Sequence, residues 1–197
     1  NLGKIYLNGP VNYYDGSIFQ YGHHLIEYDG SAWTPLLEFQ EQDFGNIHHI
    51  EDYLDGIIFI REFEDEEYNR WIETVYYDGN TFESLGLLDI KNDKFGAYVN
   101  NNMIYIASYF GDEDEELFDI LRYSDGTWSQ SFSNNPPIES GAIRSLIEFD
   151  GDWYVGGLHF NGGESQTENL YRLHDGLWSV AQDMDGNGMR GTVRKMI

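Results

Sequence analysis

GAIRSLIEFDGDWYVGG (141–157) and NLYRLHDGLW (169–178) decide the fold of this chain. Each stretch places an Asp–Gly pair between two runs that are rich in apolar and aromatic residues. Such a pair favours a tight hairpin, because the turn needs positive φ angles and Gly adopts them without steric cost. The two stretches therefore predict two hairpins, or four strands, within residues 141–178.

The second of these hairpins recurs along the chain. Its copies read LIEYDGSAW (25–33), TVYYDGNTF (74–82), LRYSDGTW (121–128) and YRLHDGLW (171–178), and successive Asp–Gly pairs are 49, 47 and 50 residues apart. The first hairpin also recurs, as GNIHHIEDYLDGIIFI (45–60) and FGAYVNNNMIYIAS (95–108). A four-stranded unit with a period of about 40 to 50 residues is typical of a propeller blade.

The two ends of the chain complete this pattern. GTVRKMI (191–197) resembles the first strand of a hairpin alone, and NLGKIYLNG (1–9) resembles the turn and second strand alone. Joined, they form one hairpin, which would leave no open sheet edge in a ring. The sequence therefore predicts an all-β, four-bladed β-propeller of four-stranded antiparallel blades, closed by pairing of the N- and C-terminal strands in one blade.

The repeat also predicts the boundaries within one domain, residues 1–197. We expect blade 1 to combine 191–197 with 1–40, and the other blades to span 45–88, 94–133 and 141–182. Half of an eight-bladed assembly would show the same repeats, so that alternative stays open. The chain starts with Asn1 and has no signal-peptide pattern, which suggests a processed or excised product.

The repeats resemble those of Kelch-like β-propeller proteins of the secreted or cell-surface bacterial type. The resemblance is carried best by residues 141–178, with Trp-Tyr-Val-Gly-Gly after the first Asp–Gly pair and Tyr-x-x-x-Asp-Gly-x-Trp later. It implies a propeller fold, an extracellular or cell-surface location and a binding role, but no particular reaction. Phe82 and the Asn-rich turn at 100–102 depart from the pattern.

Composition restricts the partners. The 35 acidic and 11 basic residues give a formal net charge of −24, which opposes binding to nucleic acids and to anionic membranes. Cations and basic protein surfaces are better matched, although the acidity could also serve solubility alone. Without any Cys, disulfides and thiolate metal sites are excluded. No apolar run is long enough to predict membrane insertion.

The acidic residues are concentrated in two loops that we expect between the second and third strands of blades 2 and 3. REFEDEEYNRW (61–71) and GDEDEEL (111–117) would lie at the same end of neighbouring blades. Their carboxylates form a predicted ligand-binding patch for a basic partner or divalent cations, with a merely solvated acidic surface as the alternative. The patch comprises Glu62, Glu64, Asp65, Glu66, Glu67, Asp112, Glu113, Asp114, Glu115 and Glu116.

Two smaller features have defined chemistry. DMDGNG (183–188) places Asp183, Asp185 and Asn187 as in the first half of a calcium loop, although Arg194 stands where the bidentate acid would be. Calcium binding and a plain polar turn therefore both remain open. In addition, His48, Arg144 and Arg194 occupy comparable first-strand positions and could line a central channel that holds an anion or water.

No catalytic motif stands out, because the chain has no G-x-S-x-G, no H-E-x-x-H and no phosphate-binding Gly-rich loop. We therefore expect a non-catalytic extracellular or cell-surface binding module that recognises a protein or a glycan through the acidic loop face. The alternatives are a carbohydrate-active hydrolase or lyase on a propeller scaffold, and a structural repeat unit of a larger surface protein. We expect the four aromatics after the Asp–Gly pairs (Trp33, Phe82, Trp128 and Trp178) to pack between blades.

Overall fold

The structure is a computed structural model. It describes residues 3–10, 13–14, 19–20, 23–38, 46–64, 70–90, 95–110, 117–132, 142–160, 168–181 and 196. All regular secondary structure in these ranges is β-strand. No helix that could cross a membrane therefore occurs among the described residues.

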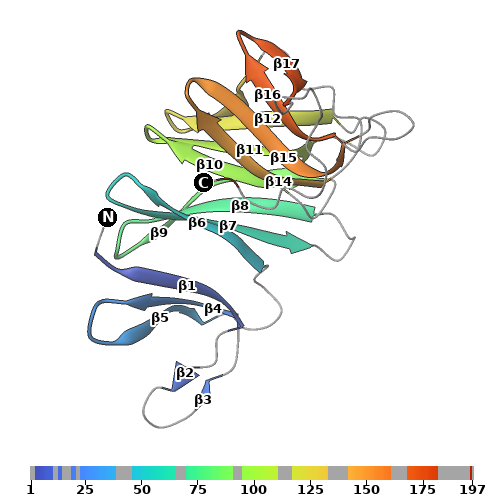
Figure 1. The fold of residues 1–197 in the computed structure, drawn as a ribbon. Coiled ribbons are helices and arrows are strands. Elements are labelled where there is room, and N and C mark those ends of the chain that lie inside the picture. Colours follow the sequence, from blue (N-terminus) through green and yellow to red (C-terminus); the bar gives the residue numbers. More distant parts are fainter. Residues whose placement is uncertain are drawn as a thin grey trace. The chain divides into compact units, whose positions relative to one another are not determined.

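Each repeat folds into one antiparallel sheet whose strands lie side by side in chain order (Figure 1). The first sheet contains β1 (Ile5–Pro10), β4 (His23–Tyr28) and β5 (Trp33–Glu38). The second contains β6 (Asn46–Tyr53), β7 (Gly56–Glu64), β8 (Arg70–Tyr77) and β9 (Phe82–Ile90). The third contains β10 (Gly96–Asn100), β11 (Met103–Phe110), β12 (Leu117–Ser124) and β13 (Thr127–Gln130). The fourth contains β14 (Ala142–Phe149), β15 (Asp152–Phe160), β16 (Glu168–His174) and β17 (Leu177–Val180).

These sheets confirm the predicted all-β fold and its four-stranded antiparallel units in the last three repeats. The first sheet has three described strands, and residues 191–197, which the sequence assigns to its missing first strand, lie outside the described residues except for Met196. An additional small hairpin of β2 (Tyr13–Tyr14) and β3 (Phe19–Gln20) precedes β4 and was not predicted. The arrangement is compatible with a four-bladed propeller.

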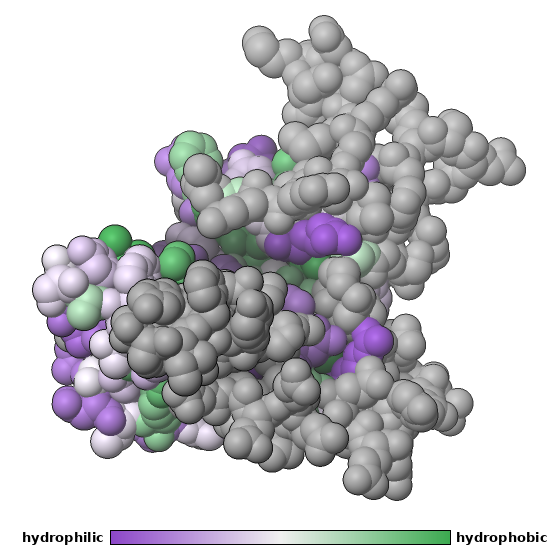
Figure 2. All heavy atoms as spheres, turned by 90° about the horizontal axis from the view of Figure 1, so that it is seen from below, coloured by the Kyte–Doolittle hydropathy of each residue, from purple (hydrophilic) through white to green (hydrophobic). Residues whose placement is uncertain are grey.

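The chain divides into two compact units, residues 1–88 and 89–197. In the first unit, Leu25 and Tyr6 of the first sheet pack with Phe59 and Val75 of the second. In the second unit, a larger core joins the third and fourth sheets, and it contains Tyr105, Ala107, Tyr109, Phe118, Ile120, Ile143, Leu146, Val155 and Tyr171. On the surface shown in Figure 2, described hydrophobic residues occur in small groups among hydrophilic ones.

The two cores use the sheets in the same way. We call the face that carries the cross-strand pairs Tyr6–Glu27, Ile58–Tyr76, Tyr105–Arg122 and Tyr154–Arg172 the forward face of its sheet, and the opposite face the rear face. The forward face of the first sheet packs on the rear face of the second. The forward face of the third sheet packs in the same way on the rear face of the fourth, where the rings of Tyr105 and Trp153 are 4.4 Å apart.

The four repeated Asp–Gly pairs form two kinds of turn. Asp125–Gly126 and Asp175–Gly176 are two-residue hairpin turns with positive φ at both residues, as an Asp–Gly hairpin requires. At Asp29 and Asp78 the loop has four residues, and the aspartate side chain accepts hydrogen bonds from the backbone N–H groups two and three residues later. This difference follows the sequence, because the latter two loops have one more residue between Gly and the aromatic residue.

Candidate functional site

The two acidic segments connect the strands that the sequence predicted. Glu62 and Glu64 lie at the end of β7, and the chain returns as β8 at Arg70. Residues 111–116 likewise connect β11 to β12. In each sheet, the strand ends that flank the segment therefore lie opposite the Asp–Gly turn. The other acidic residues of the predicted patch (Asp65, Glu66, Glu67, Asp112, Glu113, Asp114, Glu115 and Glu116) lie outside the described residues.

Two of the three predicted channel residues occupy matching irregularities. The register of β6 against β7 shifts between Ile47 and His49, which leaves His48 as the extra residue of a bulge. The register of β14 against β15 shifts in the same way around Arg144. A bulge redirects a side chain and is often found next to a functional site. His48 and Arg144 thus lie at matching bulges, whereas Arg194 lies outside the described residues and the channel stays a prediction.

His48 contacts one of the acidic residues. Its Nε2 lies 2.7 Å from Oε2 of Glu62, whose side chain is largely buried. Because an ionised carboxylate only accepts hydrogen bonds, the imidazole N–H is the donor here. On the adjacent pair of positions, Nε of Arg61 donates to Oε2 of Glu73 at 2.5 Å. The charged residues where β7 approaches the acidic segment are therefore paired with one another.

The predicted calcium ligands Asp183, Asp185 and Asn187 lie outside the described residues. Within the described ranges, no group of three or more His, Asp or Glu side chains is arranged to hold a metal ion. Calcium at residues 183–188 remains a prediction.

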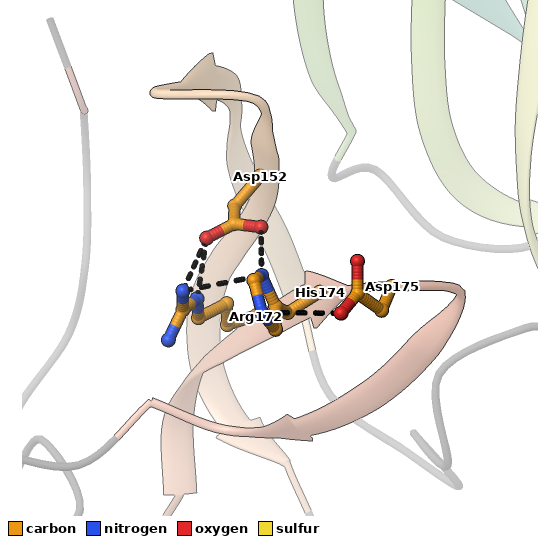
Figure 3. Close-up of polar contacts among 4 residues, drawn as sticks. All are labelled: Asp152, Arg172, His174 and Asp175. Carbon is orange, nitrogen blue, oxygen red and sulfur yellow. Dashed lines mark hydrogen bonds and ion pairs between the residues drawn. The ribbon is translucent and has the colours of Figure 1, made fainter.

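A further polar cluster, which the sequence analysis did not single out, lies at the turn end of the fourth sheet (Figure 3). Asp152 begins β15, and its carboxylate lies between Arg172 and His174 of β16. Nε of Arg172 donates to Oδ2 at 2.7 Å, and Nη2 donates to the same oxygen. Nδ1 of His174 lies 2.6 Å from Oδ1, which makes it the donor. The third guanidinium nitrogen points away from the carboxylate.

The electrostatics of the cluster follow from these contacts. The hydrogen bond from His174, followed by the contacts with Arg172, lowers the pKa of Asp152 below its ordinary value, because both donors stabilise the ionised form. The same carboxylate raises the pKa of Arg172. Asp152 thus stays ionised and fixes the orientation of both basic side chains, while the His174 side chain itself is 56% exposed.

Arg172 also belongs to a row of side chains across three strands. Tyr154 pairs with Arg172, and Arg172 pairs with Ser179, so these side chains share the forward face of the fourth sheet. Together with Val180 and Ala181 they line an open hollow of about 510 Å³. The row offers a guanidinium group and two hydroxyl groups.

The sequence reveals this cluster only in part. The turns at Asp150–Gly151 and Asp175–Gly176 fix the registers of β14 with β15 and of β16 with β17, whereas Asp152 meets Arg172 and His174 through the register of β15 with β16. The Arg-x-His spacing before an Asp–Gly turn was the available signal. It was missed because the equivalent positions in the other repeats carry different residues.

The most buried of the described acidic side chains are paired with basic residues. Among them, three are less than a tenth exposed: Glu27, Glu73 and Asp152. Each has a basic partner in its own sheet, namely Lys4, Arg61 and Arg172 respectively.

Comparison with protein-family models and with curated proteins finds no match. The resemblance to Kelch-like repeats thus stays a prediction, and the functional argument depends on the structure and the charge pattern.

Proposed function

We propose that the four sheets form a four-bladed propeller closed by the C-terminal strand. Three observations support the closure. β1 is an edge strand of a three-stranded sheet, and Gly3 before it has a positive φ of 65°, like Gly151 before β15. Moreover, the backbone N–H of Met196 donates to Oγ of Ser145 on β14 at 2.7 Å.

The contact of Met196 is the most specific of these. In the repeat, Met196 corresponds to Leu146 of a first strand, and its backbone N–H reaches Ser145 of another first strand, β14. β10 has the same relation to β14, since a Cβ at Gly96 would lie 2.9 Å from the backbone of Ser145. Ser145 thus contacts the first strands of the preceding and the following repeat, as expected for successive blades around one axis.

On this scaffold we propose a non-catalytic binding module, located at the cell surface or outside the cell, that binds a basic protein surface through its acidic loops. The observation that carries this proposal is topological: residues 65–69 connect β7 to β8 and residues 111–116 connect β11 to β12, which are the second and third strands of their sheets. Clustered carboxylates repel one another, and a cationic partner would relieve this repulsion. The net charge of −24 favours the same class of partner.

Binding of a fluorescent oligolysine peptide tests the proposal. In the test variant, Asp112→Asn, Glu113→Gln and Asp114→Asn remove three charges from the acidic loop. In the control, Asp125→Asn, Asp150→Asn and Asp175→Asn remove three charges at the turn ends, where Asn tolerates the positive φ angles of 50° to 53°. Fluorescence anisotropy at low salt should show about a tenfold loss of affinity in the test variant, equivalent to roughly 1.4 kcal/mol.

The control separates a local patch from general charge attraction. We expect it to retain most of the affinity, and added salt to weaken binding of the native chain. Equal losses in the two variants would show that only the net charge matters, and would contradict the acidic loops as the binding surface.

A further inference from the structure

The imidazole ring of His174 has a carboxylate at each of its two nitrogens (Figure 3). Nδ1 lies 2.6 Å from Oδ1 of Asp152, and Nε2 lies 3.5 Å from Oδ2 of Asp175. The hydrogen bond to Asp152 places a proton on Nδ1, so Nε2 of the neutral ring carries a lone pair. This nitrogen and the Asp175 carboxylate are therefore two electron donors side by side, an arrangement that favours a cation shared between them.

The distance between the two donor atoms fits a metal ion. Zn²⁺ binds imidazole nitrogen and carboxylate oxygen at about 2.0 to 2.2 Å, usually with tetrahedral angles. Two such bonds at a tetrahedral angle place their donor atoms about 3.4 Å apart. The distance of 3.5 Å from Nε2 of His174 to Oδ2 of Asp175 nearly equals this value, so the separation of the donors needs no rearrangement of the turn.

The sheet holds the two donors in place. His174 is the last residue of β16, and Asp175 begins the two-residue turn to β17 with a φ of 50°. From β15, the carboxylate of Asp152 fixes the orientation of the imidazole ring through Nδ1. A carboxylate that accepts a hydrogen bond from the second nitrogen is a common partner of a metal-binding histidine. The cluster thus supplies both the ligands and the group that orients one of them.

Charge and exposure at this turn also favour a cation. The charge of Arg172 is balanced by its ion pair with Asp152, whereas Asp175 adds a further negative charge. The side chains of His174 and Asp175 are 56% and 88% exposed, so an ion can reach both of them from the solvent. The net charge of −24 raises the concentration of cations near the whole surface.

We propose that His174 and Asp175 form a binding site for a divalent transition-metal ion of the zinc and copper class, with Asp152 as the positioning residue. A nitrogen donor beside an oxygen donor favours this class over Ca²⁺ and Mg²⁺, which prefer sites made of oxygen alone. With two protein ligands, water completes the coordination and the ion stays exchangeable. All three residues lie in the fourth sheet and its turn, so the site depends on neither the ring nor the acidic loops.

The third repeat contains a matched control for this site. Its Asp125–Gly126 turn has the same two-residue form as Asp175–Gly176, and Asp125 has a φ of 53°. Ser124 stands there in the place of His174, and Met103 in the place of Asp152. The control turn therefore carries the same carboxylate without the imidazole and without the orienting acid.

Cu²⁺ is the probe, because it binds such donors more tightly than Zn²⁺ does and its unpaired electron broadens nearby NMR signals. It is titrated in substoichiometric steps into the ¹⁵N-labelled native chain. We expect the amide signals of residues 174–177 to broaden at a Cu²⁺ concentration about tenfold lower than those of residues 124–127. Excess Zn²⁺ should restore the signals of 174–177 by displacing Cu²⁺.

Two single variants and a control separate the roles of the residues. Asp175→Asn keeps a residue that tolerates positive φ, and it should raise the Cu²⁺ concentration that broadens 174–177 by about tenfold or more. Asp125→Asn removes the same charge from the control turn and should leave that concentration unchanged. Ser124→His builds a second His–Asp pair beside Met103, and we expect it to bind Cu²⁺ about tenfold more weakly than the native site, because no carboxylate orients its ring.

Three results would overturn the proposal. Broadening of 174–177 no earlier than that of 124–127 would reject the site. An Asp175→Asn variant that binds Cu²⁺ like the native chain would reject Asp175 as a ligand. A Ser124→His variant that binds as tightly as the native turn would reject Asp152 as the positioning residue. Oligolysine binding reports separately on the acidic loops, so failure of the metal site and failure of the proposed function are distinguishable.

Discussion

At the scale of single residues, one pair of diagonal positions on neighbouring strands holds an ion pair in two repeats. The signs of the two charges are exchanged between these repeats. Lys4 pairs with Glu27 in the first sheet, and Asp152 pairs with Arg172 in the fourth. Each pair gives a basic partner to a carboxylate side chain that is only 10% exposed and would otherwise be costly to bury. The repeat pattern predicts where such a pair lies, but the residues that fill it vary, so a consensus cannot reveal it.

Asp29 provides a test of the turn chemistry through its titration. Its carboxylate accepts hydrogen bonds from the N–H groups of Ala32 and Ser31 and from the Ser31 hydroxyl, which lower its pKa from 3.8 to about 2. Since the folded pKa is depressed, the stabilisation is fully present above pH 3.8 and is lost as the pH falls toward 2. Carboxyl ¹³C chemical shifts should show Asp29 still about nine-tenths ionised at pH 3.

The replacement Asp29→Ala provides the matching stability measurement. It removes the acceptor, so we expect a lower Tm at pH 6 and a smaller difference from the native chain as the pH approaches 2. A titration midpoint near 3.8 would show that the loop hydrogen bonds do not persist in solution.

At the scale of elements, the sequence predicted the hairpins well because the determinants are local. The Asp–Gly pairs fix two-residue turns at 125–126 and 175–176, and the extra residue after Gly30 or Gly79 accounts for the longer loops. The bulges at His48 and Arg144 were not predicted, because a bulge depends on the facing strand. The repeat aligned His48 with Arg144, and both residues lie at bulges. The sequence alone did not show that a bulge is what these two positions share.

The contact between β10 and β14 can be tested by adding one methyl group. A Cβ at Gly96 would lie 2.9 Å from the carbonyl carbon of Ser145 and 3.1 Å from the N of Leu146. Because both are backbone atoms, the strands must move apart, so Gly96→Ala should cost about 2 kcal/mol. Denaturant unfolding followed by Trp fluorescence measures this loss.

Gly151→Ala is the control for this substitution. That glycine has a φ of 81°, and a Cβ added to it would meet no atom within 4 Å, so the expected cost of about 1 kcal/mol comes from the backbone alone. If Gly96→Ala were no more destabilising than Gly151→Ala, the close approach of β10 to β14 would be wrong.

At the scale of the whole molecule, the sequence predicted more than the described residues test. The number of repeats and the split hairpin at the termini follow from sequence similarity alone. Closure depends on long-range packing between a rear face and a forward face, and neither face shows its partner in the sequence.

Moving the C-terminal strand to the other end of the chain tests the closure. Deleting 191–197 should leave β1 at an open edge, lower the Tm and promote aggregation, because an unpaired edge strand recruits other strands. Fusing GTVRKMI directly before Asn1 in the shortened chain restores the predicted hairpin within one continuous segment. If 191–197 pairs with β1, this permuted chain should recover a monomeric state by light scattering and most of the lost thermal stability. It should still unfold more easily than the native chain, because the ring is no longer tied by strands from both termini. A permuted chain as unstable as the deletion would mean that 191–197 stabilises the fold without pairing with β1, and the closed ring would have to be abandoned.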